Sequence, residues 1–317
     1  MSGAVTRAVR LALPTEASTA ALRAALWEGD AGRAAFDSWV ARVGDPRDLP
    51  SDQRQAVREL APQLDEARRG HGAPAPGALG VLLHAAADHE RRRWTPYRNA
   101  AVDLLGDEAE PLVTGGLATA LAAHPEPALR HCHDLDRLGP APATATHPSG
   151  LPTVVHQGLL PPAWGADEDL DALRSRSVAD DRLGRPIRRL GVGDLLVTVL
   201  VHSIAGGRGH SVRWASDVSL LARVATEGDW AVVSRTVTDH CLGPVVLPSL
   251  RFVADDLCGA VPTAVVDEVV DLPGPDDARA DVAMAWARRG RQRRMRTGRM
   301  ASRARSRSSA IRGRLRR

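Results

Sequence analysis

The sequence predicts an α+β protein: a small α/β core with a mixed sheet, placed between two helical regions and followed by a basic tail. Three observations support this division. Helical apolar spacing fills both ends of the body, short β-branched runs gather in its middle, and the last 30 residues hold 14 arginines and no acid. A chain of 317 residues is also longer than one average domain. The expected regions are a helical region 1–95, the core 96–162, a second helical region 163–287 and the tail 288–317.

The N-terminal region has the apolar spacing of amphipathic helices. Ser18 and Thr19 are candidate N-cap residues for a first helix. Phe36 and Trp39 belong to the apolar stripe of a second helix, and the Gly-Asp pair at 29–30 separates the two. We therefore expect a helical pair to precede the core.

The approach to the core begins at a Pro/Gly-rich connector over 70–80. A helix is predicted over 82–105, kinked or restarted at Pro96, because proline lacks an N–H and crowds the preceding turn. The run "EPLVTGG" then predicts a short buried strand that turns into a helix. "HDLDRL" and "TVVHQGLL" alternate or carry β-branched residues, as strands do.

Helical patterns return after residue 162. Leu195–Ile204 is apolar on all sides, which predicts a buried helix. Three later apolar stripes also have helical spacing. They are Trp214, Val218, Leu221 and Ala225; Trp230, Val233 and Val237; and Leu250, Val253 and Leu257.

Charge is divided unevenly along the chain. The formal net charge is +4, and residues 288–317 alone carry +14, so residues 1–287 carry 4 − 14 = −10. Such an arginine run repels itself and is expected to be disordered when free. It has three possible roles: non-specific binding of nucleic acid or another polyanion, contact with the acidic body, or a solvated extension. We favour the polyanion.

The chain contains no lysine, which excludes mechanisms that need a lysine nucleophile or a lysine phosphate clamp. Its three cysteines show no metal-binding or disulfide spacing, as is usual in a reducing compartment. The longest apolar run, "LLVTVLV", is too short to span a bilayer, and the N-terminus shows no signal peptide pattern. We expect a soluble, cytoplasmic protein without a membrane partner.

Two short stretches carry possible chemistry. Gly115 and Gly116 stand where a strand is predicted to meet a helix, so backbone N–H groups at the helix N-terminus can approach a phosphate. A plain tight turn would look the same. Asp134 and Asp136, at i and i+2 on a strand, project from one face and can hold a divalent cation together. The similar "DEDLD" at 167–171 is interpreted as a solvated loop.

The order of these stretches carries more information than either alone. A Gly-Gly turn, a short helix, and a Pro-x-Pro-x-Leu-Arg-x-x-x-Asp-Leu-Asp stretch follow one another in "TGGLATALAAHPEPALRHCHDLD". This series resembles an uncharacterised nucleotidyltransferase family within the DNA polymerase β-like nucleotidyltransferase superfamily. "RRRWTPYRN", "LGVGDLLVTVLVH" and "VRWASDVSLLAR" are similar to further helices of that family, in the same order, so the resemblance covers roughly 20–265.

The resemblance implies a nucleotidyltransferase core and the use of a nucleoside triphosphate with Mg²⁺ or Mn²⁺. It implies that Asp134 and Asp136 are catalytic metal ligands and that Gly115, Gly116 and Arg130 contact the nucleotide. Four accessory positions also match the pattern or replace it: Thr114, His156, His202 and Arg213. Each of three residues also has a purely structural alternative. Arg130 could pair with an acid, His202 could be a core histidine, and Arg213 could form an i,i+4 ion pair with Asp217.

Three positions depart from the family pattern. Thr114 replaces a lysine, Val154 replaces the third carboxylate, and Thr198 replaces a histidine. In this superfamily the third carboxylate completes the metal site and helps to activate the attacking hydroxyl. Two hypotheses follow: a slow nucleotidyltransferase with an unknown acceptor, or an inactive scaffold of the same fold. Members of the family occur in gene sets for modified peptides, so the scaffold would bind a peptide or a partner protein.

Overall fold

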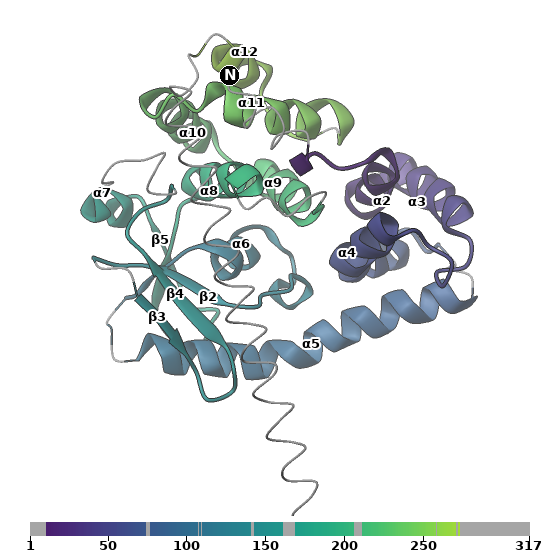
Figure 1. Ribbon diagram of the computed structural model, residues 1–317, viewed down its shortest axis with the longest axis horizontal. Coiled ribbons are helices and arrows are strands. Elements are labelled where there is room, and N and C mark those ends of the chain that lie inside the picture. The colour runs from purple at the N-terminus through teal and green to yellow at the C-terminus, as the bar shows by residue number, and fades with distance from the viewer. Residues whose placement is uncertain are drawn as a thin grey trace, which may run out of the picture.

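The protein is an α+β structure with a six-stranded mixed sheet and, among the described residues, eleven α-helices (Figure 1). The predicted α+β class is therefore confirmed. The computed structural model describes residues 11–73, 77–106, 108, 110–140, 143–160, 169–205, 211–257, 259–270 and 272. The predicted tail, 288–317, lies outside the described residues.

The first helices are α2 (Glu16–Leu26), α3 (Gly29–Val43) and α4 (Ser51–Gly70). Thr15 is the N-cap of α2, and its side chain accepts a hydrogen bond from the backbone N–H of Ser18. The predicted caps Ser18 and Thr19 are wrong, because both lie buried inside the first turns. The break at 29–30 is confirmed, since α3 begins there.

Helix α5 (Gly77–Leu105) is the longest element and passes through Pro96 without interruption. Of the two predicted effects of Pro96, the restart is therefore excluded and the kink stays a prediction, and the helix begins five residues before the predicted position 82. In Figure 1 it runs beneath the molecule from the N-terminal helices to the sheet. One helix thus carries residues of both predicted regions, on either side of the 95–96 boundary.

The sheet contains β1 (Leu112–Val113), β2 (Leu135–Leu138), β3 (Ala143–Thr146), β4 (Pro152–His156), β5 (Val178–Asp180) and β6 (Ile187–Arg189). Their order across the sheet is β3-β4-β2-β1-β6-β5. The pairs β2–β4 and β1–β6 are parallel, and the others are antiparallel. Strands β1, β2 and β4 occupy the three predicted strand runs. Strands β5 and β6 come from the region predicted as helical, so the sheet extends beyond residue 162.

Helix α6 (Gly115–Ala123) connects β1 to β2 and packs against the sheet. Leu117, Ala118, Ala120 and Leu121 are fully buried, because the helix is apolar almost all round. A short 3-10 turn, Pro127–Leu129, follows it and leads to the carboxylates. The predicted strand-to-helix junction in "EPLVTGG" is confirmed.

The C-terminal region contains α7 (Leu170–Ser175), α8 (Val192–Ala205), α9 (Arg213–Val224), α10 (Glu227–Asp239), α11 (Gly243–Arg251) and α12 (Thr263–Val270). The predicted buried helix is α8. Nearly all residues of the three predicted stripes are buried, and Ala225 alone is only partly so. No helix in the described part of the chain is both long and apolar enough to cross a membrane.

The N-terminal helices contact the C-terminal helices directly. The Glu59 carboxylate of α4 accepts hydrogen bonds from Ser211 Oγ at 2.9 Å and from the backbone N–H groups of Val212 and Arg213 at 2.9 and 3.3 Å. It therefore caps the N-terminus of α9, where unpaired N–H groups favour a negative charge. Trp214 Nε1 also donates to the Ala12 carbonyl.

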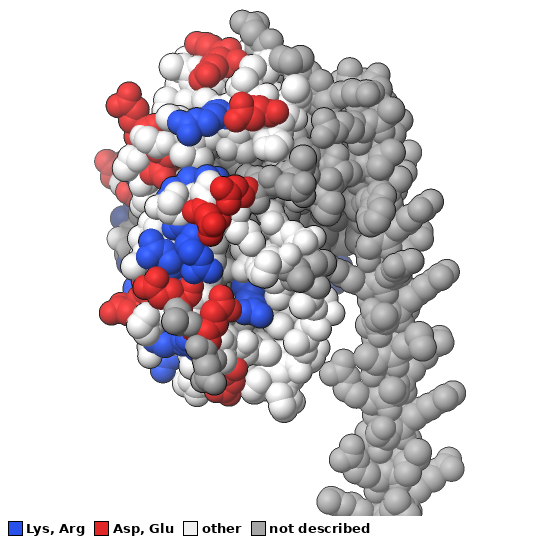
Figure 2. All heavy atoms as spheres, turned by 90° about the vertical axis from the view of Figure 1, so that its left-hand side faces the viewer, with Lys and Arg blue, Asp and Glu red and all other residues white. Residues whose placement is uncertain are grey.

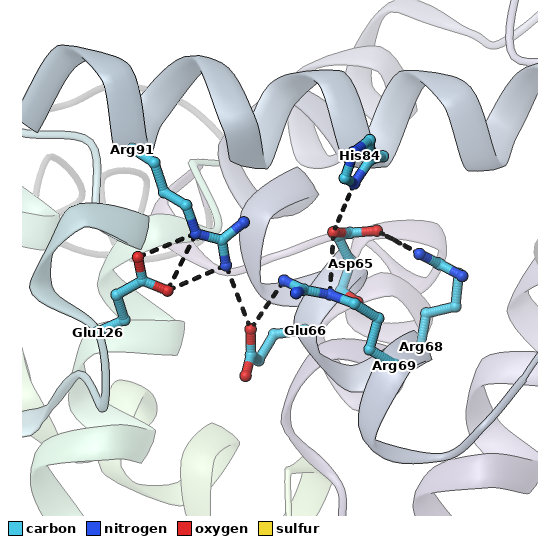
Figure 3. A network of polar contacts seen from close by, with 7 residues as sticks. All are labelled: Asp65, Glu66, Arg68, Arg69, His84, Arg91 and Glu126. Atoms are coloured by element: carbon cyan, nitrogen blue, oxygen red, sulfur yellow. Dashed lines mark hydrogen bonds and ion pairs between the residues drawn. The ribbon is translucent and has the colours of Figure 1, made fainter.

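A second connection joins α4, α5 and the segment before β2 (Figure 3). The Arg91 guanidinium of α5 lies between two acids, 2.9 Å from Glu126 and 3.7 Å from Glu66 of α4. Asp65, whose side chain is fully buried, is surrounded by Arg68, Arg69 and His84. This network attaches the helical region to the chain that leads into the candidate site.

Figure 2 shows acidic and basic side chains interspersed over the described part of one face. Several of the charges near the β5–β6 end of the sheet are paired, as in Arg182–Asp180, Arg137–Glu108 and Arg188–Glu110. The described part of this face therefore carries both signs rather than one continuous acidic patch. Contact between the basic tail and the acidic body remains one of the three possible roles of the tail, and the polyanion role remains the prediction.

Candidate functional site

The structure brings the Gly-Gly turn and the two aspartates together. Strand β1 ends one residue before Thr114, which is the N-cap of α6. Its neighbour in the sheet is β2, and the Thr114 N–H donates to the Asp136 carbonyl at 3.0 Å. The two stretches, about 20 residues apart in sequence, therefore lie side by side at the two middle strands of the sheet.

At both glycines a side chain would clash with a neighbouring residue. Gly115 has φ +60°, and a Cβ there would collide with the carboxylate of Asp136. A Cβ at Gly116 would lie 2.5 Å from Nη1 of Arg130. Because the two glycines lack side chains, the Asp136 carboxylate and the Arg130 guanidinium can lie against the N-terminus of α6. The helix dipole favours the carboxylate there. Both glycines are also partly exposed to solvent.

Asp134 lies immediately before β2 and Asp136 is its second residue, and each has a histidine partner. Asp136 Oδ1 is 2.8 Å from His156 Nε2, and Asp134 Oδ2 is 3.2 Å from His133 Nε2. The two carboxylate side chains are 20% and 18% exposed. They remain reachable from solvent, so a ligand or cation can approach them.

Val154 stands beside Asp136 on the neighbouring strand. The two residues are paired in the parallel register of β2 and β4, so their side chains project to the same face. His156, two residues further along β4, shares that face and reaches Asp136. The ring of His202 on α8 lies 6.5 Å from the His156 ring, centroid to centroid. An apolar side chain therefore lies beside Asp136 on this face of the sheet.

Tyr97 is a site residue that the sequence did not indicate. Its hydroxyl donates to the Asp134 carbonyl at 3.0 Å, and its ring stacks on Trp94. Burial raises its pKa well above the usual value, and the nearby carboxylates of Asp134 and Asp136 contribute to the increase. The hydroxyl therefore stays protonated and holds the backbone at Asp134. The only feature of the sequence that could have drawn attention to Tyr97 is that the chain contains a single tyrosine.

Arg130 is buried in an ion pair with Asp217 of α9. Its Nε and Nη2 donate to the two carboxylate oxygens at 2.9 and 2.7 Å, and His124 Nε2 lies 3.3 Å from Oδ1. Burial alone would raise the pKa of Asp217, but Arg130 and His124 together hold it well below its usual range. Of the two alternatives for Arg130, the structure shows the acid pair. Asp217 thus has a strong partner other than the Arg213 expected from i,i+4 spacing, and neither Asp217 nor His124 was predicted as a site residue.

Asp134 and Asp136 offer hard oxygen donors of the kind that Mg²⁺ or Mn²⁺ binds, while Val154 offers none. Among the described residues, no three His, Cys, Asp or Glu side chains are arranged to hold a metal ion. Two carboxylates suit a cation whose remaining ligands are nucleotide phosphates and water. The residues present therefore fit a cation that arrives with a nucleotide.

A pocket of about 200 Å³ lies elsewhere, between α7 and α10. Arg176, Arg235, Asp239 and His240 are among the residues that line it. None of the predicted site residues does.

The sequence and the structure were compared with known proteins. No family model, no curated protein and no solved structure matches this chain.

Proposed function

We propose that this protein is a divergent nucleotidyltransferase that transfers a nucleotidyl group from a nucleoside triphosphate to a hydroxyl of an acceptor not yet known. One observation carries the proposal: the glycine turn at the N-terminus of α6 is hydrogen-bonded to the strand that bears Asp136. The turn proposed to bind phosphate therefore lies next to Asp136, one of the two carboxylates proposed to bind the cation, and this neighbourhood suits phosphoryl chemistry.

The chain's residues have separable roles in this proposal. The N–H groups that follow Thr114 face the phosphates, and Asp134 and Asp136 hold Mg²⁺ or Mn²⁺. When bound, the cation neutralises the charge that develops on the phosphate oxygens. Tyr97 and His156 orient the two aspartates through the Asp134 carbonyl and the Asp136 carboxylate.

Val154 makes the proposed enzyme slow. A valine cannot accept the proton of an attacking hydroxyl, and a positioned general base contributes about 100-fold or more to such a step. In Val154→Asp the new carboxylate would stand beside Asp136 on the same face. A weak transferase activity should therefore increase by about two orders of magnitude.

The test is calorimetric titration of the protein with each nucleoside triphosphate in the presence of Mg²⁺. We expect binding in the wild type and loss of it in Asp134→Asn with Asp136→Asn. The chain offers a matched control, because Asp169-Leu170-Asp171 repeats the same tripeptide at the start of α7. Asp169→Asn with Asp171→Asn should bind as the wild type does. Absence of binding by the folded wild type would reject the proposal.

The second candidate is a non-catalytic scaffold that binds a peptide or a partner protein. Val154 beside Asp136 is the observation that favours it, because loss of selection for catalysis leaves apolar residues at matched positions. The double aspartate variant separates the two candidates. An unchanged cellular phenotype in a folded double variant supports the scaffold, and a lost phenotype supports the enzyme.

A further inference from the structure

The buried pair of Arg130 and Asp217 leaves one end of the guanidinium with only two weak hydrogen bonds. Asp217 takes Nε and Nη2, and the remaining nitrogen, Nη1, has only long contacts, 3.5 Å to the His131 carbonyl and 3.7 Å to Cys132 Sγ. A normal N–H···O hydrogen bond is about 2.9 Å long, and sulfur is a weak acceptor. Nη1 therefore retains capacity to donate, and it is the end that lies against Gly116.

Thr114 provides an independent sign of a missing ligand at the same place. The residue is 4% exposed, and its Oγ1 has no hydrogen-bond partner among the described residues. An N-cap threonine usually accepts from the N–H of the second or third helical residue, but Thr114 makes no such bond to α6. A buried, unpaired hydroxyl costs free energy, so a group that hydrogen-bonds to Thr114 Oγ1 would stabilise this position.

The pair itself stays ionised and fixed. Burial alone would lower the pKa of Arg130, but Asp217 raises it above the ordinary value, so the guanidinium is charged at any ordinary pH. Asp217 belongs to α9, and Glu59 of α4 caps the N-terminus of that helix. The position of Nη1 is therefore determined by three segments that are far apart in the sequence.

We propose that Asp217 and His124 are positioning residues that aim Arg130 Nη1 at a phosphate group bound at Gly116 and Thr114. The inference rests on the proposed nucleotide function and adds to it the device that presents the cationic donor. The ligand class is a phosphate chain carried by a divalent cation, because Asp134 and Asp136 beside the turn would repel a free polyphosphate. Arg130 thus serves both as the partner of Asp217 and as a donor to the ligand.

The experiment compares Asp217→Asn and Asp217→Glu with the wild type. Each is titrated with two probes, ATP and inorganic pyrophosphate, both with Mg²⁺, and its thermal stability is measured in parallel. We expect Asp217→Asn to bind both probes at least about tenfold more weakly, because a hydrogen bond from a charged donor is misplaced. Asp217→Glu should recover part of the affinity.

The matched control is Asp194→Asn. Asp194 of α8 is also buried and also accepts a bidentate ion pair, from Arg176 at 2.8–3.0 Å, but it does not contact the glycine turn. It should lose stability without losing affinity. If Asp217→Asn fails to fold, Arg130→Lys replaces it, since an ammonium cannot bridge Asp217 and the turn.

Each outcome bears on one proposal or both. Equal affinity of the folded Asp217→Asn variant and the wild type overturns this inference and leaves the nucleotide function standing. Pyrophosphate binding that depends on Asp217, without nucleotide binding, supports the anion site and rejects the nucleotidyltransferase. Binding of neither probe by the wild type overturns both.

Discussion

Gly115→Ala tests whether the Asp136 carboxylate lies over the first turn of α6. Alanine at φ +60° costs about 1–2 kcal/mol, because the left-handed region is unfavourable for a residue with a Cβ. The new Cβ would also collide with the Asp136 carboxylate, which must then move and lose its 2.8 Å contact with His156. Losing a charge-assisted hydrogen bond costs a further ~1.5–3 kcal/mol. The expected loss in the free energy of unfolding is therefore about 2.5–5 kcal/mol.

Gly29→Ala is the control for this variant. Gly29 has the same φ of +60°, but no atom lies within 4 Å of a Cβ built there. Gly29→Ala should lower the free energy of unfolding only by the cost of the left-handed backbone conformation, about 1–2 kcal/mol. Urea unfolding followed by far-ultraviolet circular dichroism measures both variants. Equal losses in the two would refute the placement of Asp136 over the turn.

Three further predictions concern residues that hold the site. Because the pKa of folded Asp217 lies well below 3.8, its stabilising contribution is complete above about pH 4 and is lost as the pH falls below that value. Acid unfolding should therefore be shallower for Asp217→Asn than for the wild type, and parallel curves would contradict the assignment. Tyr97→Phe removes the donor to the Asp134 carbonyl and should cost about 1 kcal/mol, measured by urea unfolding. Glu59→Gln weakens the cap of α9 and should lower stability by about 1–2 kcal/mol, with faster amide exchange in the first turn of α9 as the diagnostic result.

Local patterns in the sequence were sufficient for much of the fold. The break between α2 and α3, the junction of β1 and α6, and the buried helix α8 all follow from apolar spacing and glycine, which act within a few residues. The adjacency of Gly115 and Asp136 was expected from the order of two motifs, and the pairing of β1 with β2 produces it. These features depend on the chain's own short-range preferences, so one sequence can reveal them.

Only the tertiary structure decided the features that depend on distant partners. Strands β5 and β6 have three residues each and carry little apolar pattern, and the place of β6 in the sheet is set by backbone pairing to β1 and β5 together with one buried side chain, Ile187. Arg130 and Asp217 are 87 residues apart, and Tyr97 reaches Asp134 across 37. Whether an arginine pairs with an acid or remains available to a phosphate depends on whether the fold buries a carboxylate beside it. That choice follows from packing of α9 on α6, to which no local spacing in the sequence corresponds.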